Sequence, residues 1–138
     1  MRVVPDTNVL LAALPHTSDS HLIFLELIRG TYELCLTSDI LNEYEEVFQK
    51  RANREVATLA LDVLDILPNL LYINKYYFWR FITVDPDDNK FVDCAAIAAN
   101  ADFIVTDDKH SKVLKDIPFP KVNIISKQAF LEMLEGKR

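Results

Sequence analysis

Short apolar runs alternate along the chain with segments in which apolar residues recur every three or four positions. The runs predict strands at residues 2–5, 32–37, 81–84, 103–106 and 122–125. The helical spacing predicts helices at residues 9–13, 21–29, 39–51, 55–66, 89–100 and 127–134. Gly30 is expected to end the second helix, Ser38 to cap the third and Pro68 to close the fourth. Strands that alternate with helices indicate an α/β fold with a parallel sheet covered on both faces.

Residues 70–79, LLYINKYYFW, fit neither pattern. Three roles are open for the aromatic residues Tyr76 to Trp79: packing in the core beside a sheet edge, contact with a second subunit, or stacking on nucleic-acid bases. Core packing is the favoured interpretation.

The composition predicts one domain over residues 1–138, because half of the residues are hydrophobic and no repeat or linker composition occurs. Asp6 and Asn8 interrupt the apolar N-terminus before a signal-peptide core or a membrane span could form, so a cytoplasmic protein is expected. Cys35 and Cys94 lie in apolar surroundings without C-x-x-C spacing, which indicates buried free thiols.

The formal net charge of −6 argues against a protein that binds nucleic acid mainly through a basic surface. A cluster of carboxylates that holds divalent cations would weaken this objection, because the cations reverse the local field where a phosphate binds. The distribution of acids along the chain therefore decides whether a nuclease is a reasonable hypothesis.

Acidic residues follow three of the predicted strands. Asp6 follows the first, Asp85, Asp87 and Asp88 follow the strand at 81–84, and the pair Asp107 and Asp108 follows the strand at 103–106. Ligands of parallel sheets bind beyond the carboxyl ends of the strands, so these acids are expected at one edge. Each also has a structural alternative: an Asx turn or helix cap for Asp6, a helix start with Asp85 as the N-cap, and a turn for Asp107 and Asp108.

Two further acids lie inside predicted helices. Glu43 is early in the helix at 39–51 and could reach the same edge, although an ordinary surface role is open. Asp93 is set among small and apolar residues and shares a helix face with Asn89. A buried aspartate needs a partner, and a metal ion is one.

Oxygen donors without a supporting histidine or cysteine favour Mg²⁺ or Mn²⁺ over zinc. The three histidines, His16, His21 and His110, are scattered and lack metal-ligand spacing. Thr7 and Asn8 could bond to Asp6 or to backbone amides, and Thr106 adds a hydroxyl beside Asp108. We therefore expect one or two Mg²⁺ or Mn²⁺ ions at this edge.

Three segments resemble the PIN-domain family, and within it the toxin components related to the VapC ribonucleases: VVPDTNVLLAAL, LTSDILNEYEEVF and VDPDDNKFVDCAAIAANADFIVTDD. The last is the most specific, because it joins an acidic helix start, an aspartate within the helix, an alanine-rich helix and a strand that ends in T-x-D. The resemblance implies a three-layer α/β/α sandwich with a central parallel sheet, and a metal-dependent endoribonuclease that hydrolyses RNA. It also implies the toxin of a toxin–antitoxin pair, with an antitoxin protein as partner, and a homodimer.

Carried over residue by residue, the resemblance makes four acids catalytic and metal-binding: Asp6, Glu43, Asp93 and Asp108. Asn8 and Thr106 match supporting polar positions, and Asp88 and Asn89 are further supporting candidates. Two residues depart from the family pattern. Pro5 replaces an aliphatic strand residue and removes a backbone donor, and Asp107 replaces a small residue and adds negative charge beside the site.

Alternatives from other classes fit less well. A haloacid-dehalogenase-like phosphatase needs a second aspartate two residues after the first, where this chain has Asn8, and a receiver domain needs a phosphoacceptor with a late lysine partner. A non-catalytic PIN-like module for binding or assembly stays open.

Overall fold

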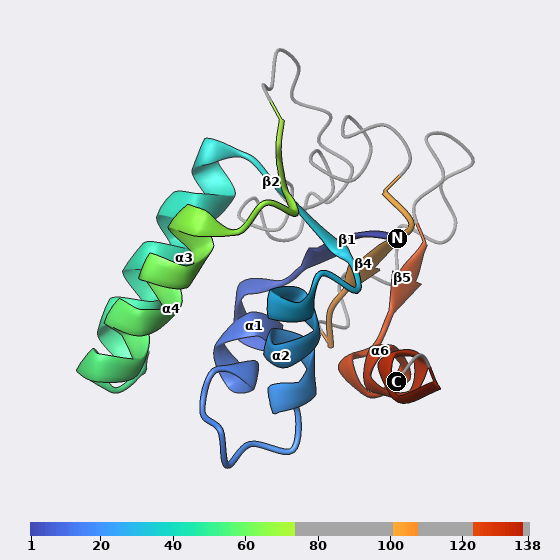
Figure 1. The fold of residues 1–138 in the computed structure, drawn as a ribbon, viewed down its shortest axis with the longest axis horizontal. Coiled ribbons are helices and arrows are strands. Elements are labelled where there is room, and N and C mark those ends of the chain that lie inside the picture. The colour runs from blue at the N-terminus through green and yellow to red at the C-terminus, as the bar shows by residue number, and fades with distance from the viewer. Residues whose placement is uncertain (74–100, 108–122, 137–138) are drawn as a thin grey trace.

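The computed structural model describes residues 1–73, 101–107 and 123–136 (Figure 1). In chain order its elements are β1 (Arg2–Pro5), α1 (Thr7–Ala13), α2 (His21–Arg29), β2 (Glu33–Leu36), α3 (Ser38–Arg51), α4 (Arg54–Ile66), β3 (Leu70–Tyr72), β4 (Phe103–Val105), β5 (Ile124–Ile125) and α6 (Lys127–Gly136).

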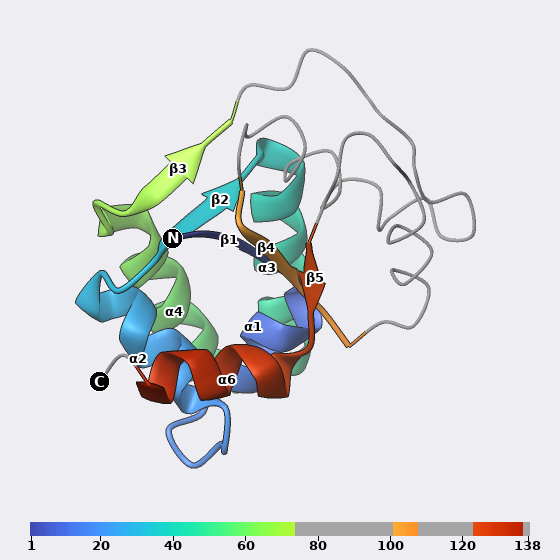
Figure 2. The ribbon, with the colours of Figure 1, turned by 90° about the vertical axis from the view of Figure 1, so that its right-hand side faces the viewer.

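The five strands form one parallel sheet in the order β3-β2-β1-β4-β5. Figure 2 shows the strands side by side, with α2 and α6 along the lower side of the view. The central strands β1, β2 and β4 consist largely of buried residues, as expected for strands covered on both faces. The predicted α/β fold with a central parallel sheet is therefore confirmed.

The described helices contact one another in the order α6, α2, α1, α3, α4, and α3 also contacts β2. Large buried side chains fill the space between these elements. Tyr32 meets Phe130 of α6 edge to face at 5.2 Å, and Tyr44 stacks on Phe48 within α3 at 5.8 Å. Gly30 ends α2 in the left-handed conformation, with φ of 83°, as the sequence predicts.

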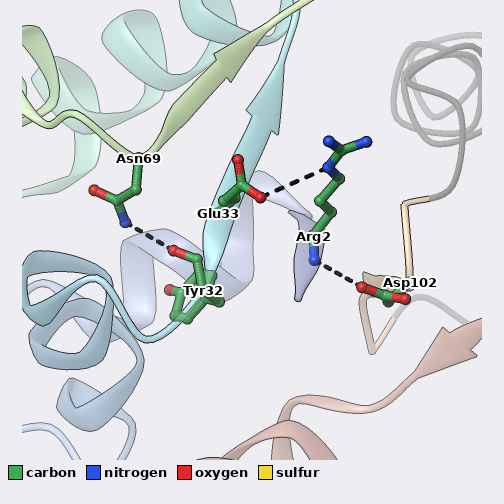
Figure 3. A network of polar contacts seen from close by, with 5 residues as sticks. All are labelled: Arg2, Tyr32, Glu33, Asn69 and Asp102. Carbon is green, nitrogen blue, oxygen red and sulfur yellow. Dashed lines mark hydrogen bonds and ion pairs between the residues drawn. The ribbon is translucent and has the colours of Figure 1, made fainter.

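Polar contacts tie the amino ends of the strands together (Figure 3). The backbone of Arg2 donates to Asp102 at 2.8 Å, and its guanidinium lies 3.6 Å from Glu33. Asn69, which precedes β3, donates its amide to the carbonyls of Leu27 and Tyr32 at 3.0 and 2.7 Å. The Arg2–Glu33 pair is exposed and contributes little to stability, so the backbone and amide contacts are the ones that hold this edge.

Several element boundaries differ from the prediction for local reasons. The N-cap of α3 is Thr37 and not Ser38, because the Thr37 hydroxyl accepts the backbone N–H of Ile40. Asn53 caps α4 in the same way, so this helix starts at Arg54. The segment that fits neither pattern begins with strand β3, which sequence analysis missed.

The predicted strand at 81–84, the helix at 89–100 and the aromatic residues Tyr76 to Trp79 lie outside the described residues. Cys35 is a buried free thiol, as predicted, and burial raises its pKa to about 11. Cys94 lies outside the described residues. Within the described ranges, no helix has the length and apolar character needed to cross a membrane.

Candidate functional site

Asp6 lies at the junction between β1 and α1, at the carboxyl edge of the sheet. Its N–H donates to the carbonyl of Val105 at 2.9 Å, and its carbonyl accepts the N–H groups of Val9 and Leu10 at 3.0 and 3.2 Å. The backbone of Asp6 therefore both extends the pairing of β1 with β4 and begins α1. Its carboxylate makes no capping hydrogen bond to α1, so the helix-cap alternative does not describe the side chain.

Thr106 lies beside Asp6 and donates its hydroxyl to the Asp6 carboxylate at 3.0 Å. The two residues are 100 positions apart, and the sheet register brings them together because Pro5 pairs with Val105. Thr106 is buried, and its N–H donates to the carbonyl of Ile125 at 3.0 Å. The predicted supporting position of Thr106 is thus next to the first predicted acid.

Glu43 comes to the same junction from α3. The hydroxyl of Thr7, the residue after Asp6, hydrogen-bonds to a carboxylate oxygen of Glu43. Thr7 is buried and Glu43 is half-buried. Glu43 is therefore not an ordinary solvated residue of the helix surface. Sequence analysis considered Thr7 as a partner of Asp6 or of the backbone and missed its contact with Glu43.

Tyr44, the next residue of α3, holds the other neighbour of Asp6. Its buried hydroxyl donates to the carbonyl of Pro5 at 2.8 Å. The backbone N–H and C=O groups of successive residues in a strand point to opposite sides. The N–H of Asp6 faces β4, so the backbone nitrogen and carbonyl of Pro5 face β2. The paired residues of β1 and β2 end at Val3 and Leu34, so the missing donor of Pro5 interrupts no ladder bond.

Asp107, the second departure from the family pattern, has a structural partner. Its exposed carboxylate accepts the backbone N–H of Lys127, the first residue of α6, at 3.0 Å. An acceptor and a negative charge both stabilise a helix N-terminus. This acid, for which the sequence offered a turn as the structural alternative, instead bonds to the start of the helix after β5.

The remaining predicted site residues fall into two groups. Asn8 is exposed on α1. Asp93, Asp108, Asp88 and Asn89 lie outside the described residues. Within residues 1–73, 101–107 and 123–136, no group of three or more histidine, cysteine or acidic side chains could hold a metal ion.

The donor chemistry of the described half of the site fits a hard divalent cation. Asp6 and Glu43 supply carboxylate oxygens, and Thr106 and Thr7 hold them by neutral hydroxyl groups. His21 lies elsewhere, with its Nδ1 2.7 Å from the carbonyl of Ala13. An oxygen donor set of this kind matches Mg²⁺ or Mn²⁺ better than zinc.

Comparison with known proteins identifies the family. The model of the PIN domain family matches residues 2–110, so the chain belongs to the PIN-domain family, as its sequence motifs predict. No curated protein matches the sequence. Among solved structures, the chain is similar to a chain in the crystal structure of VapBC2 from Rickettsia felis bound to a DNA fragment from their promoter.

That similarity has a TM-score of 0.61 at 18% sequence identity, and it covers 91% of this chain and 98% of the other. At so low an identity, the similarity shows that the two chains share a fold and shows nothing about function. The family assignment and the fold agree, because the parallel sheet of this chain matches the α/β fold of that solved structure.

The contact of Asp107 with α6 makes a testable prediction. Asp107→Ala removes the acceptor for the Lys127 N–H but leaves the cap that Ser126 makes to Ala129, so it should lower the free energy of unfolding by about 0.5–1.5 kcal/mol. Asp107→Asn keeps an acceptor and loses only the charge, so its loss should be smaller. Urea unfolding of the three proteins measures the difference. An Asp107→Ala protein as stable as wild type would remove the capping role.

Proposed function

We propose that this chain is a metal-dependent endoribonuclease that hydrolyses RNA phosphodiester bonds, and that it is the toxin of a toxin–antitoxin pair. One observation supports the proposal most directly. The Asp6 carboxylate lies at the carboxyl edge of the sheet and accepts a hydrogen bond from Thr106, which follows β4. Thr7, the residue after Asp6, donates a hydrogen bond to Glu43 of α3. Two of the four proposed metal-binding acids thus come from separate elements to one junction.

The proposed site residues divide into metal ligands and supporting residues. Asp6, Glu43, Asp93 and Asp108 would hold one or two Mg²⁺ or Mn²⁺ ions, with Asn8, Asp88 and Asn89 as supporting residues. When bound, such an ion lowers the pKa of a coordinated water and offsets negative charge on the phosphate. Thr106 orients the Asp6 carboxylate, since a carboxylate that accepts a hydrogen bond keeps its rotamer.

Charge is the main obstacle to RNA binding by this chain, whose net charge is −6. The repulsion between RNA and the protein would be strongest at an edge that gathers carboxylates. A site that binds RNA only when divalent cations are present resolves this conflict, because the cations reverse the field locally. The proposed dependence on metal is therefore also a dependence of substrate binding on metal.

An antitoxin is the proposed protein partner. The support is the fold similarity to a chain of VapBC2, which was crystallised bound to promoter DNA. A cytoplasmic location is proposed with it, because the RNA substrate and the partner would be met there. The competing function is a non-catalytic PIN-like module for binding or assembly, in which Asp6 and Glu43 would be structural.

A cleavage assay separates the two functions. Structured and unstructured RNA should be cut in Mn²⁺ or Mg²⁺ and left intact in EDTA. Substituting a residue that supports a metal ligand usually lowers activity by roughly 10- to 100-fold. Asp6→Asn changes a proposed ligand itself, so it should lower the cleavage rate by at least as much. Asp93→Asn should do the same, whereas Asp85→Ala, which removes a predicted helix cap, should keep most of the activity. Equal activity of wild type and Asp6→Asn would favour the binding module.

Divalent metal should also stabilise the fold, because it relieves repulsion among the proposed ligands. A ligand that binds only the native state contributes about 2.7 kcal/mol at 100 times its Kd. Melting temperatures in millimolar Mn²⁺ should therefore exceed those in EDTA by several degrees, and Asp6→Asn should reduce the difference. The same melting temperature in both buffers would contradict a shared metal site.

A homodimer is the last part of the proposal. Leu59 and Ile66 lie two turns apart on α4 and are 65% and 79% exposed, which gives this helix apolar surface for a second copy. Light scattering at high micromolar concentration should give the mass of a dimer, and Ile66→Glu should shift it toward monomer. A wild-type protein that is monomeric throughout the concentration range would refute this part.

A further inference from the structure

We propose that Thr7 is a positioning residue that fixes the side chain of Glu43 for metal binding. The inference rests on the proposed function, since it assumes that Glu43 is a metal ligand. It concerns a residue that lies beside Asp6 but is not among the proposed metal ligands or supporting residues. Thr7 would act through Glu43 and would itself contact neither the ion nor the RNA.

The contact joins two elements at a buried point. Thr7 is the first residue of α1 and is 3% exposed, and its hydroxyl bonds to the Glu43 carboxylate on α3. Thr7 has few accessible rotamers because its side chain branches at Cβ. The donor is therefore held by the helix backbone and by its own burial, and it selects one position for a longer side chain.

The adjacent contact shows why this point is well determined. Tyr44, next to Glu43, donates to the carbonyl of Pro5, and Thr7 bonds to Glu43 itself. Two consecutive residues of α3 thus hold the two neighbours of Asp6 in the chain. This arrangement, which we call the α3 clasp, consists of Pro5, Thr7, Glu43 and Tyr44, and it joins α3 to both chain neighbours of Asp6.

The chemistry of the donor suits a metal ligand. Glutamate has three rotatable side-chain bonds, so an unrestrained Glu43 would sample many positions. A hydrogen bond to a charged acceptor is stronger than one between neutral groups, so the bond from Thr7 restricts the Glu43 side chain to one of these positions. A hydroxyl is neutral, so Thr7 holds the carboxylate without supplying a cation that would compete with the metal ion.

Three variants test the inference. Thr7→Val keeps the shape of the side chain and removes the donor, Thr7→Ser restores a hydroxyl, and Tyr44→Phe is the matched control. Tyr44→Phe removes a buried hydroxyl from the same clasp but leaves the Thr7–Glu43 bond in place. Two quantities are measured on each full-length protein: Mn²⁺ affinity by calorimetry, and the side-chain order of Glu43 by ¹³C relaxation without metal.

The expected pattern is specific. Thr7→Val should weaken Mn²⁺ binding by about 10- to 100-fold, the usual effect of removing a partner of a metal ligand, and should lower the order of the Glu43 side chain. Thr7→Ser should recover most of both. Tyr44→Phe should lower the melting temperature while Mn²⁺ affinity stays near the wild-type value.

Two results would overturn the inference in distinguishable ways. If wild type binds Mn²⁺ and Thr7→Val binds it equally well, or if Tyr44→Phe weakens binding as much as Thr7→Val, then Thr7 has only a structural role and the proposed function stands. If wild type binds no Mn²⁺, the proposed function fails and this inference fails with it. In that second case the order of Glu43 still reports whether Thr7 restrains it.

Discussion

The parallel pairing of β1 with β4 is the constraint on which the candidate site depends. Backbone bonds close this pair at both ends, from Asp102 to Arg2 and from Asp6 to Val105. Val4, Ile104 and Val105 are buried on both faces of the sheet, so these backbone bonds, and not a difference between the faces, set the register. The register then determines which side chain lies next to Asp6. If β4 were shifted by one residue along β1, a residue next to Thr106 would lie beside Asp6. The hydrogen bond between Thr106 and Asp6, which are 100 positions apart, would then be lost.

The sequence predicts the parts of the site that depend on local pattern and sheet order. An apolar run followed by Asp6, and a second followed by Thr106, are sufficient to place both residues at one edge, since parallel strands end together. The bond between Thr7 and Glu43 could not be predicted, because it depends on how α1 packs against α3 and not on spacing in the chain. Strand β3 was missed for a related reason. Its three residues, Leu70 to Tyr72, open the apolar and aromatic segment LLYINKYYFW, whose continuous run shows neither period and does not mark where a strand ends.

Neighbouring residues of similar chemistry set another limit on prediction. Thr37 and Ser38 are both good N-caps, and the structure uses Thr37 because its hydroxyl accepts the N–H of Ile40. Asp107 and Asp108 are equivalent by composition, yet Asp107 bonds to the first turn of α6, which only the path of the chain after β5 could reveal. Pro5 looked unfavourable in a strand, but its nitrogen is on the β2 side of β1, beyond the last paired residues Val3 and Leu34. Its carbonyl accepts the hydroxyl of Tyr44.

A buried acid is by itself a poor sign of a metal site, and Glu26 shows why. It is 4% exposed on α2, yet its carboxylate accepts from Arg29 at 2.8 Å and from Thr31 at 2.5 Å. The guanidinium cancels the charge that burial would otherwise penalise. The contacts of Asp6 and Glu43 described above come from hydroxyls, which orient a carboxylate and themselves add no positive charge. A cationic partner such as Arg29 therefore marks an acid whose charge serves the fold, whereas a hydroxyl partner is compatible with the proposed binding of a cation.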